Sequence, residues 1–134
     1  MIVDTSAILA ILFSEPDAAT YASAITNAPS SRISAATFLE VAIVVEAQTE
    51  NSGPRQLDAL LRRANITIET VTEEQAHIAR QAYTDFGKGR HPARLNYGDC
   101  FSYALAKVTG EPLLYKGGDF AKTDITSALS RSGV

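Results

Sequence analysis

Residues 1–13 read MIVDTSAILAILF, a short apolar run that stops at an acid and then continues as an apolar helical pattern. Met1 to Val3 is typical of a buried strand, and the residues after Asp4 are spaced as in a helix. Asp4 is therefore expected at the carboxyl end of a strand, where open parallel sheets gather their ligand-binding residues. A turn residue at a strand end is the simpler interpretation of Asp4, and this segment alone leaves it open.

The rest of the chain alternates between helical and strand patterns. Further strands are predicted at residues 32–34, 66–71 and 113–115. Further helices are predicted at residues 16–27, 35–48, 53–64, 72–86 and 97–109. Short strands that alternate with helices imply a parallel sheet covered on both faces. The predicted fold class is therefore α/β, a three-layer α/β/α arrangement around a short central parallel sheet of about four to five strands.

Length and composition limit the class of protein further. A chain of 134 residues with 46% hydrophobic residues can close one core, so residues 1–134 are predicted to form a single domain. Cys100 is the one cysteine and has no disulfide partner, which favours a reduced, cytoplasmic protein. The apolar run from Ile8 to Phe13 is far shorter than the roughly 20 residues of a membrane span, so no membrane association is expected. Residues 130–134 are expected to be a frayed tail.

Net charge does not identify the partner. The chain has 12 basic and 15 acidic residues and a formal charge of −3, which argues weakly against nucleic acid. If four of the acids bind metal, the remaining residues are 12 basic and 11 acidic, and the bound cations would attract phosphate. Charge therefore neither supports nor excludes RNA.

Two acids within apolar helices are candidate functional residues, because Asp and Glu are almost never buried without a partner. Glu40 lies within FLEVAIVV, residues 38–45, and no basic residue lies between Arg32 and the end of that helix. Asp99 is the third residue of a helix that is apolar nearly all round. Simpler interpretations stay open: Glu40 as a partly exposed or distantly paired acid, and Asp99 as a helix-capping residue.

A further acid, Asp119, follows the last predicted strand and the pair Gly117-Gly118, which returns it to the same sheet edge, although an Asx turn explains it equally well. The candidate acids are thus Asp4, Glu40, Asp99 and Asp119. Clustered carboxylates repel one another, and Mg²⁺ or Mn²⁺ relieves that repulsion. Such ions activate water and stabilise the leaving oxygen of a phosphodiester. The pattern favours metal-dependent phosphodiester hydrolysis.

At these residues the sequence resembles the PIN-domain family, in particular the VapC toxins of bacterial and archaeal toxin–antitoxin pairs. The resemblance covers nearly the whole chain and depends on segments that occur in family order and spacing. These are MIVDTSA at 1–7, Glu40, LNYGDC at 95–100 with YALA at 103–106, and LLYKGGDF at 113–120 with Thr123-Asp124.

The resemblance implies a magnesium-dependent endoribonuclease, with Mn²⁺ as a possible substitute. Asp4 and Asp99 would be the principal metal ligands, and Glu40 and Asp119 would complete the catalytic site. Ser6 matches a hydroxyl that hydrogen-bonds within this cluster. Two neighbouring residues are assigned lesser roles: Thr5 caps the helix, and Asp124 belongs to a turn.

The resemblance also implies partners. These are a structured RNA substrate (a tRNA or a ribosomal RNA loop), a second copy in a homodimer, and a cognate VapB antitoxin in a higher assembly. The candidate phosphate contacts are Lys88, Arg90, Arg94 and Lys116, with a solvated loop as the alternative. The apolar surface offered to an antitoxin includes Leu12, Phe13, Val44 and Val45.

Three other classes of protein share some of these features. A receiver-type phosphoacceptor domain needs paired acids after the first strand, where this chain has Asp4-Thr5-Ser6. A dehalogenase-type phosphatase needs a second Asp at the position of Ser6. A catalytically silent PIN fold that only binds RNA or protein remains the main alternative, although acids at all four positions count against it.

Overall fold

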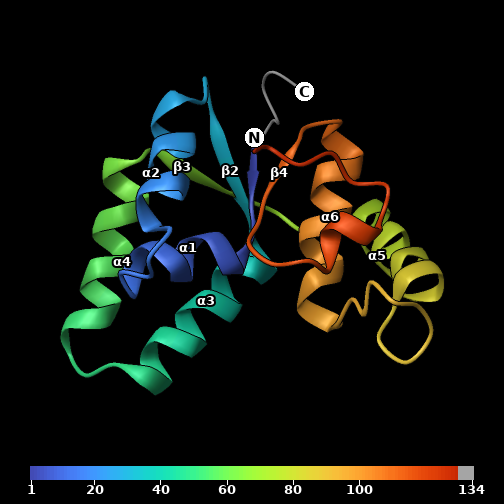
Figure 1. Ribbon diagram of the computed structural model, residues 1–134, viewed down its shortest axis with the longest axis horizontal. Helices are drawn as coiled ribbons and strands as arrows, with labels where there is room; N and C mark the ends of the chain where they lie inside the picture. The colour runs from blue at the N-terminus through green and yellow to red at the C-terminus, as the bar shows by residue number, and fades with distance from the viewer. Residues whose placement is uncertain (130–134) are drawn as a thin grey trace.

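The computed structural model describes residues 1–129, which form a four-stranded parallel sheet between two layers of helices (Figure 1). The strands are β1 (Ile2–Val3), β2 (Ser31–Ser34), β3 (Ile66–Glu69) and β4 (Leu113–Leu114). They pair in parallel in the order β3-β2-β1-β4. The expected tail at residues 130–134 lies outside the described residues.

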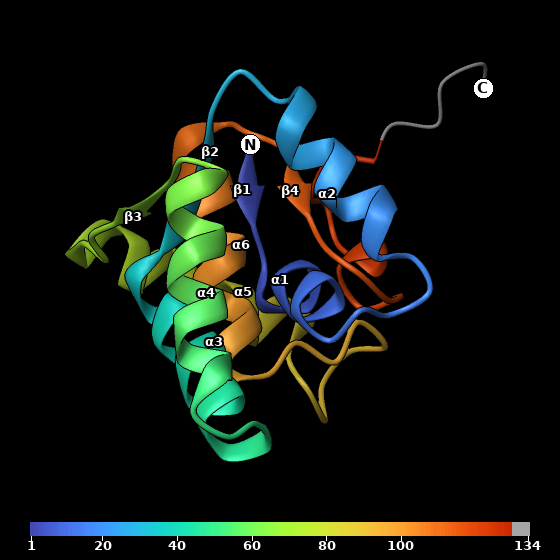
Figure 2. The same ribbon diagram turned by 90° about the vertical axis from the view of Figure 1, so that its left-hand side faces the viewer.

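Helices connect and cover the strands. They are α1 (Thr5–Leu12), α2 (Ala18–Asn27), α3 (Ala35–Gln48), α4 (Ser52–Arg63), α5 (Glu73–Phe86), α6 (Tyr97–Thr109) and the short 3₁₀ helix η1 (Phe120–Lys122). Figures 1 and 2 show α1, α2 and α4 on one side of the sheet and α5 and α6 on the other. The predicted three-layer α/β/α arrangement is confirmed. Across residues 1–129, every helix falls short of the length and apolar character that a membrane crossing requires.

Two apolar clusters fill the spaces on either side of the sheet, because successive strand residues point to opposite faces. Val3 and Leu114 pack with α1 to α4, whereas Ile2 and Leu113 pack with α5 and α6. All four of these side chains are fully buried. The short central strands are thus covered on both faces, as their continuous apolar sequence predicts.

Two strands end earlier than predicted, and the pairing explains why. β3 pairs only with β2, and the pairing ends at Ser34 and Glu69, where β2 passes directly into α3. β4 ends at Leu114 because its partner β1 stops at Val3 before the turn into α1. Strand length is therefore set by the partner strand rather than by the residue's own strand preference.

The ends of α6 follow local sequence signals. Asn96 begins α6 with a reciprocal capping box, in which its side chain accepts from the Asp99 N–H and Asp99 accepts from the Asn96 N–H. Gly110 ends α6 in the left-handed conformation, with φ of 69°, which glycine adopts without steric cost. These signals fix where Asp99 lies on the first turn of α6.

Candidate active site

Asp4 lies at the carboxyl end of β1 and caps α1, and it is 4% exposed. Its Oδ2 accepts hydrogen bonds from the Ser6 N–H at 3.0 Å and the Ser6 hydroxyl at 2.7 Å. Its Oδ1 accepts one from the Ser102 hydroxyl at 2.6 Å. The Ser6 Oγ in turn accepts from the backbone N–H of Lys116 at 2.9 Å. The Asp4 carboxylate is therefore held from both of its oxygens.

A buried pair of hydroxyls behind Asp4 was not predicted from the sequence. Ser102 on α6 and Thr37 on α3 are each 1% exposed, and their hydroxyl oxygens are 3.1 Å apart. Because Ser102 donates to Asp4, Thr37 donates to Ser102, and both buried hydroxyls are satisfied. The available signal was a serine three residues after Asp99 in a helix that is otherwise apolar.

Glu40 comes to the site on α3, which packs against both α1 and α6. The Thr5 hydroxyl donates a hydrogen bond to Glu40 Oε1. The prediction that Thr5 caps α1 is wrong, because Asp4 is the capping residue and Thr5 is the first residue of the helix. On the other side, a Cβ at Gly98 would overlap the Glu40 carboxylate. The glycine lets α6 approach Glu40 closely.

Asp99 is both a capping residue and a member of the acidic cluster. Its Oδ2 accepts from the Asn96 N–H at 3.0 Å. Partial burial raises the pKa of Asp99, the hydrogen bond from Asn96 opposes this, and the charges of Asp4, Glu40 and Asp119 raise it further, to about 7. The capping role and the clustered role, which the sequence left as alternatives, therefore occur together.

Asp119 stands at the edge of the cluster. It precedes η1, is exposed, and makes no side-chain capping bond. Its negative charge acts on Asp99, together with the charges of Asp4 and Glu40. Within residues 1–129, none of these four acids forms an ion pair with a basic side chain. The cluster is a net negative charge without a protein counter-ion.

The donor chemistry of this cluster fits a hard divalent cation. Among the described residues, no group of three or more Asp, Glu, His or Cys side chains lies close enough together to hold a metal ion. Mg²⁺ needs no such set, since it keeps several waters and takes one or two carboxylates. Asp4 Oδ1 accepts a single hydrogen bond, and Asp99 Oδ1 accepts none from residues 1–129, so both oxygens have free lone pairs.

Lys116 is not free to contact phosphate, contrary to the prediction. Its ammonium donates to Glu15 and, at 2.9 Å, to Asp17. These two hydrogen bonds raise the pKa of Lys116 to about 12. The lysine instead joins the segment after β4 to the segment after α1.

Two other predicted residues have defined surroundings. Asp124 lies in a bend, as predicted, but it also accepts from the Tyr103 hydroxyl at 2.7 Å and the Lys107 ammonium at 2.9 Å. Cys100 is 5% exposed, and burial raises its pKa to about 11, as expected for a packing residue.

Known proteins resemble this chain along nearly its whole length. A family model described as PIN domain matches residues 1–125. Ribonuclease VapC28 of Mycobacterium tuberculosis is 55% identical over 132 residues, which covers 98% of this chain and 99% of that protein. Ribonuclease VapC of Mycolicibacterium smegmatis is 51% identical over 127 residues, covering 95% of this chain and 98% of the relative.

Solved structures share the fold at low sequence identity. The crystal structure of Mycobacterium tuberculosis VapC20, a sarcin–ricin loop cleaving toxin, superposes with a TM-score of 0.72 at 19% identity, covering 93% of this chain and 95% of that one. A toxin–antitoxin complex from Klebsiella pneumoniae gives a TM-score of 0.67 at 21% identity, covering 92% of each chain. These matches leave the receiver and dehalogenase interpretations without support. With a family model across most of its length and relatives at about half identity, the chain belongs to the PIN-domain family, among the VapC ribonucleases.

Proposed function

We propose that this protein is a divalent-metal-dependent endoribonuclease toxin whose catalytic residues are Asp4, Glu40, Asp99, Asp119 and Ser6. The observation on which this depends most is the cluster of acids without ion pairs at the carboxyl end of the sheet, where partial burial and then the charges of the other three raise the pKa of Asp99. An uncompensated acidic cluster is costly to a fold unless it binds a cation. The ribonuclease relatives make a nuclease metal site the most economical explanation.

Asp4 and Asp99 are the proposed principal ligands of Mg²⁺, or of Mn²⁺ in its place, and Glu40 and Asp119 complete the site. When bound, the metal activates a water and stabilises the leaving oxygen of a phosphodiester. The protein's part is to hold the carboxylates still. Ser6 fixes one oxygen of Asp4, and the capping box fixes Asp99 on the first turn of α6.

The proposed substrate is a structured RNA cut within an exposed loop, either of a tRNA or of ribosomal RNA. Loops expose bases and backbone that duplex interiors hide. The VapC20 structure is described as that of a sarcin–ricin loop cleaving toxin, which makes a ribosomal RNA loop a natural first choice for testing.

The proposed partners are a cognate VapB antitoxin and a second copy of the chain, within a larger cytoplasmic toxin–antitoxin assembly. The Klebsiella neighbour is a toxin–antitoxin complex, which supports an antitoxin. α3 exposes two large apolar side chains suited to docking, Leu39 at 57% and Ile43 at 58%. Val45 cannot contribute as the sequence suggested, since it is 1% exposed and belongs to the core.

The test compares wild-type protein with Asp4→Asn on total cellular RNA, with Mg²⁺ and with EDTA, by mapping new 5′ ends. We expect discrete cuts that vanish both with EDTA and with the substitution. Asp58→Asn on the outer side of α4 is the matched control, because Asp58 is exposed and remote from the cluster, and it should cut like wild type. If folded, antitoxin-free wild type with Mg²⁺ makes no cuts, the silent binding-module interpretation replaces this one.

A further inference from the structure

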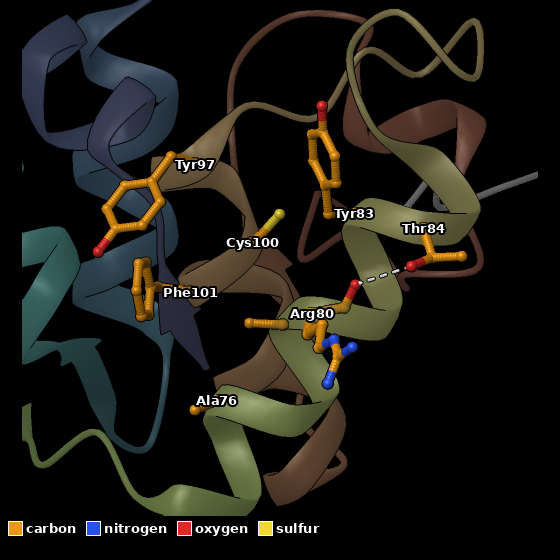
Figure 3. A pocket seen from close by; sticks show the side chains of 8 residues that line it. Ala76, Arg80, Tyr83, Thr84, Tyr97, Cys100 and Phe101 are labelled. Carbon is orange, nitrogen blue, oxygen red and sulfur yellow. Dashed lines mark hydrogen bonds between the residues drawn. The ribbon is translucent and has the colours of Figure 1, made fainter.

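A groove of about 520 Å³ lies between α5 and α6 (Figure 3). We call it the aromatic groove, and its main lining residues are Ala76, Ala79, Cys100, Tyr83, Tyr97 and Phe101. Figure 3 shows Tyr97 and Phe101 on α6 and Tyr83 on α5, with Cys100 between them in this view. Its volume lies within the range of about 300–1,000 Å³ that is typical of small-ligand sites.

The aromatic groove exposes ring surface that the fold does not use. Tyr97 is 81% exposed, and its only aromatic neighbour within residues 1–129 is Phe101, edge to face at 5.0 Å. Tyr83 is 42% exposed. Tyr97 adds nothing to the two apolar clusters of the core, so its ring is available to another molecule.

The groove and the acidic cluster share the first turn of α6. Tyr97 and Phe101 are four residues apart and lie on one side of this helix. Gly98 and Ser102 each follow by one position, about 100° around the helix, and lie against Glu40 and Asp4. The aromatic groove and the acidic cluster thus lie on neighbouring faces of the N-terminal part of α6. A nucleotide chain that passes the acids therefore reaches the groove with a neighbouring nucleotide.

Two arginines lie at the aromatic groove, although the whole chain has a formal charge of −3. Arg80 lines the groove, and the Arg90 guanidinium lies 5.6 Å from the centre of the Tyr83 ring. Lys88 and Arg94 lie in the same exposed loop as Arg90. Within the described residues these four cations form no ion pair with an acid. This charge is complementary to a phosphate backbone.

We propose that the aromatic groove binds one unpaired base of the RNA strand next to the cut, with Tyr97 stacking on the base and Arg80 and Arg90 facing its phosphates. Aromatic rings rimmed by arginines are the composition with which proteins hold single-stranded RNA. The exposed cations at this site, Arg80 and Arg90, favour a partner that carries phosphates over a purely apolar one. The inference rests on the proposed function, because it places the base relative to the acids.

The test measures binding of two synthetic RNAs in EDTA, where cleavage is not involved: the sarcin–ricin stem-loop and a tRNA anticodon stem-loop. Each is made intact and in versions that lack the base at one loop position. Tyr97→Ala should weaken binding of intact RNA about tenfold or more, and Tyr97→Phe should bind like wild type. For the RNA that lacks the stacked base, Tyr97→Ala should cause no further loss, since non-additive losses identify a direct contact. Ile68→Ala is the control, because Ile68 is 44% exposed on β3, away from the groove.

The outcomes separate this inference from the proposed function. Additive losses, or unchanged binding by Tyr97→Ala, overturn the base site even if wild type cuts RNA with Mg²⁺. Non-additive losses with no cleavage by wild type support the base site and contradict the nuclease. A fall in native molar mass in Tyr97→Ala, measured by light scattering, also overturns the base site, because a second copy then occupies the groove.

Discussion

At the scale of single residues, the position of the Asp4 side chain is fixed by hydrogen bonds from the hydroxyl groups around it. Its oxygens accept from Ser6 and Ser102, and Thr37 stands behind Ser102. The sequence predicted Asp4 because an acid after an apolar strand is conspicuous. It did not predict Ser102 or Thr37, since a lone hydroxyl in a helix commonly bonds to its own backbone. Only the packing of α3 against α6 shows that the hydroxyls of Thr37 and Ser102 are in contact.

Removal of the Ser102 hydroxyl should loosen Asp4 without removing an acid. Ser102→Ala leaves the Thr37 hydroxyl unpaired in the core and one Asp4 oxygen with no partner. We expect the free energy of unfolding to fall by about 1–3 kcal/mol and the cleavage rate by about 10- to 100-fold. Urea unfolding and a Mg²⁺ titration of cleavage measure the two effects.

Ser23→Ala on α2 is the matched control, since Ser23 is an exposed helical serine remote from the site. It should change neither quantity. A Ser102→Ala variant that loses stability but keeps its wild-type rate and Mg²⁺ dependence would show that Ser102 supports the fold and not the position of Asp4.

At the scale of elements, the site depends on how closely α3 and α6 approach. Glu40 on α3 lies against Gly98 on α6, where a side chain would overlap the carboxylate. The capping box at Asn96 could be predicted from sequence because it is local. The contact between Glu40 and Gly98 could not, because it joins residues that are distant in the chain and is set by helix packing.

Gly98→Ala tests this close approach. Alanine favours a helix over glycine by about 1 kcal/mol, so a gain in stability is expected if nothing else changes. The new methyl group would displace the Glu40 carboxylate, which is the far end of a flexible side chain and can move at little cost. We therefore expect the displacement to cancel part of that gain in stability and to cause a marked fall in cleavage. Urea unfolding and cleavage rates of the mapped RNA measure both.

A second substitution makes the interpretation specific. In the background of Glu40→Ala, the displaced carboxylate is gone, and Gly98→Ala should stabilise the protein. Gly118→Ala is the control for an added methyl group, because a Cβ there meets no atom within 4 Å. An equal change in stability from Gly98→Ala with and without Glu40 would contradict the proposed contact.

Asp124, in the segment after β4, accepts hydrogen bonds from Tyr103 and Lys107 on α6. The stability that these bonds contribute depends on pH. Partial burial would raise the pKa of Asp124, but the hydrogen bonds from Lys107 and Tyr103 outweigh it and hold the pKa below its usual value. A lowered folded-state pKa gives stability that is present above the ordinary pKa of about 3.9 and is lost as pH falls through the lowered value.

Asp124→Asn should therefore reduce the free energy of unfolding near neutral pH by less than about 1 kcal/mol, because the pair is half exposed. Its difference from wild type should shrink as the pH falls below about 4. Urea unfolding at several pH values measures this. A difference that grows on acidification would mean that the Asp124 charge destabilises the fold.

At the scale of the whole molecule, much of the arrangement was predictable from the sequence. Helix and strand order followed from local periodicity, and the three-layer arrangement followed from that order. The pairing order β3-β2-β1-β4 was not predicted. It depends on which strands the connecting helices bring side by side, and this is set by packing between segments that are distant in the sequence. That residues 1–134 form one domain stays a prediction. The sharing of one sheet by both apolar clusters supports it.

The four acids were predicted and the groove was not, for a related reason. Acids in apolar segments stand out residue by residue, whereas the aromatic groove joins Tyr83 on α5 to Tyr97 on α6 across a helix interface. Lys116 was misassigned for the same reason, since Glu15 and Asp17 are about a hundred residues away in the chain. Both the groove and the ion pairs of Lys116 depend on contacts between residues that are distant in the sequence.

The most direct test of the account is the cleavage rate of Asp99→Asn against wild type at saturating Mg²⁺, on the RNA that wild type cuts. Asn can still accept the Asn96 N–H, so the α6 capping box and the fold should persist, as circular dichroism can verify. We predict a loss of at least about a hundredfold for Asp99→Asn. A folded Asp99→Asn protein that cleaves at the wild-type rate would contradict the assignment of the acidic cluster as the catalytic metal site.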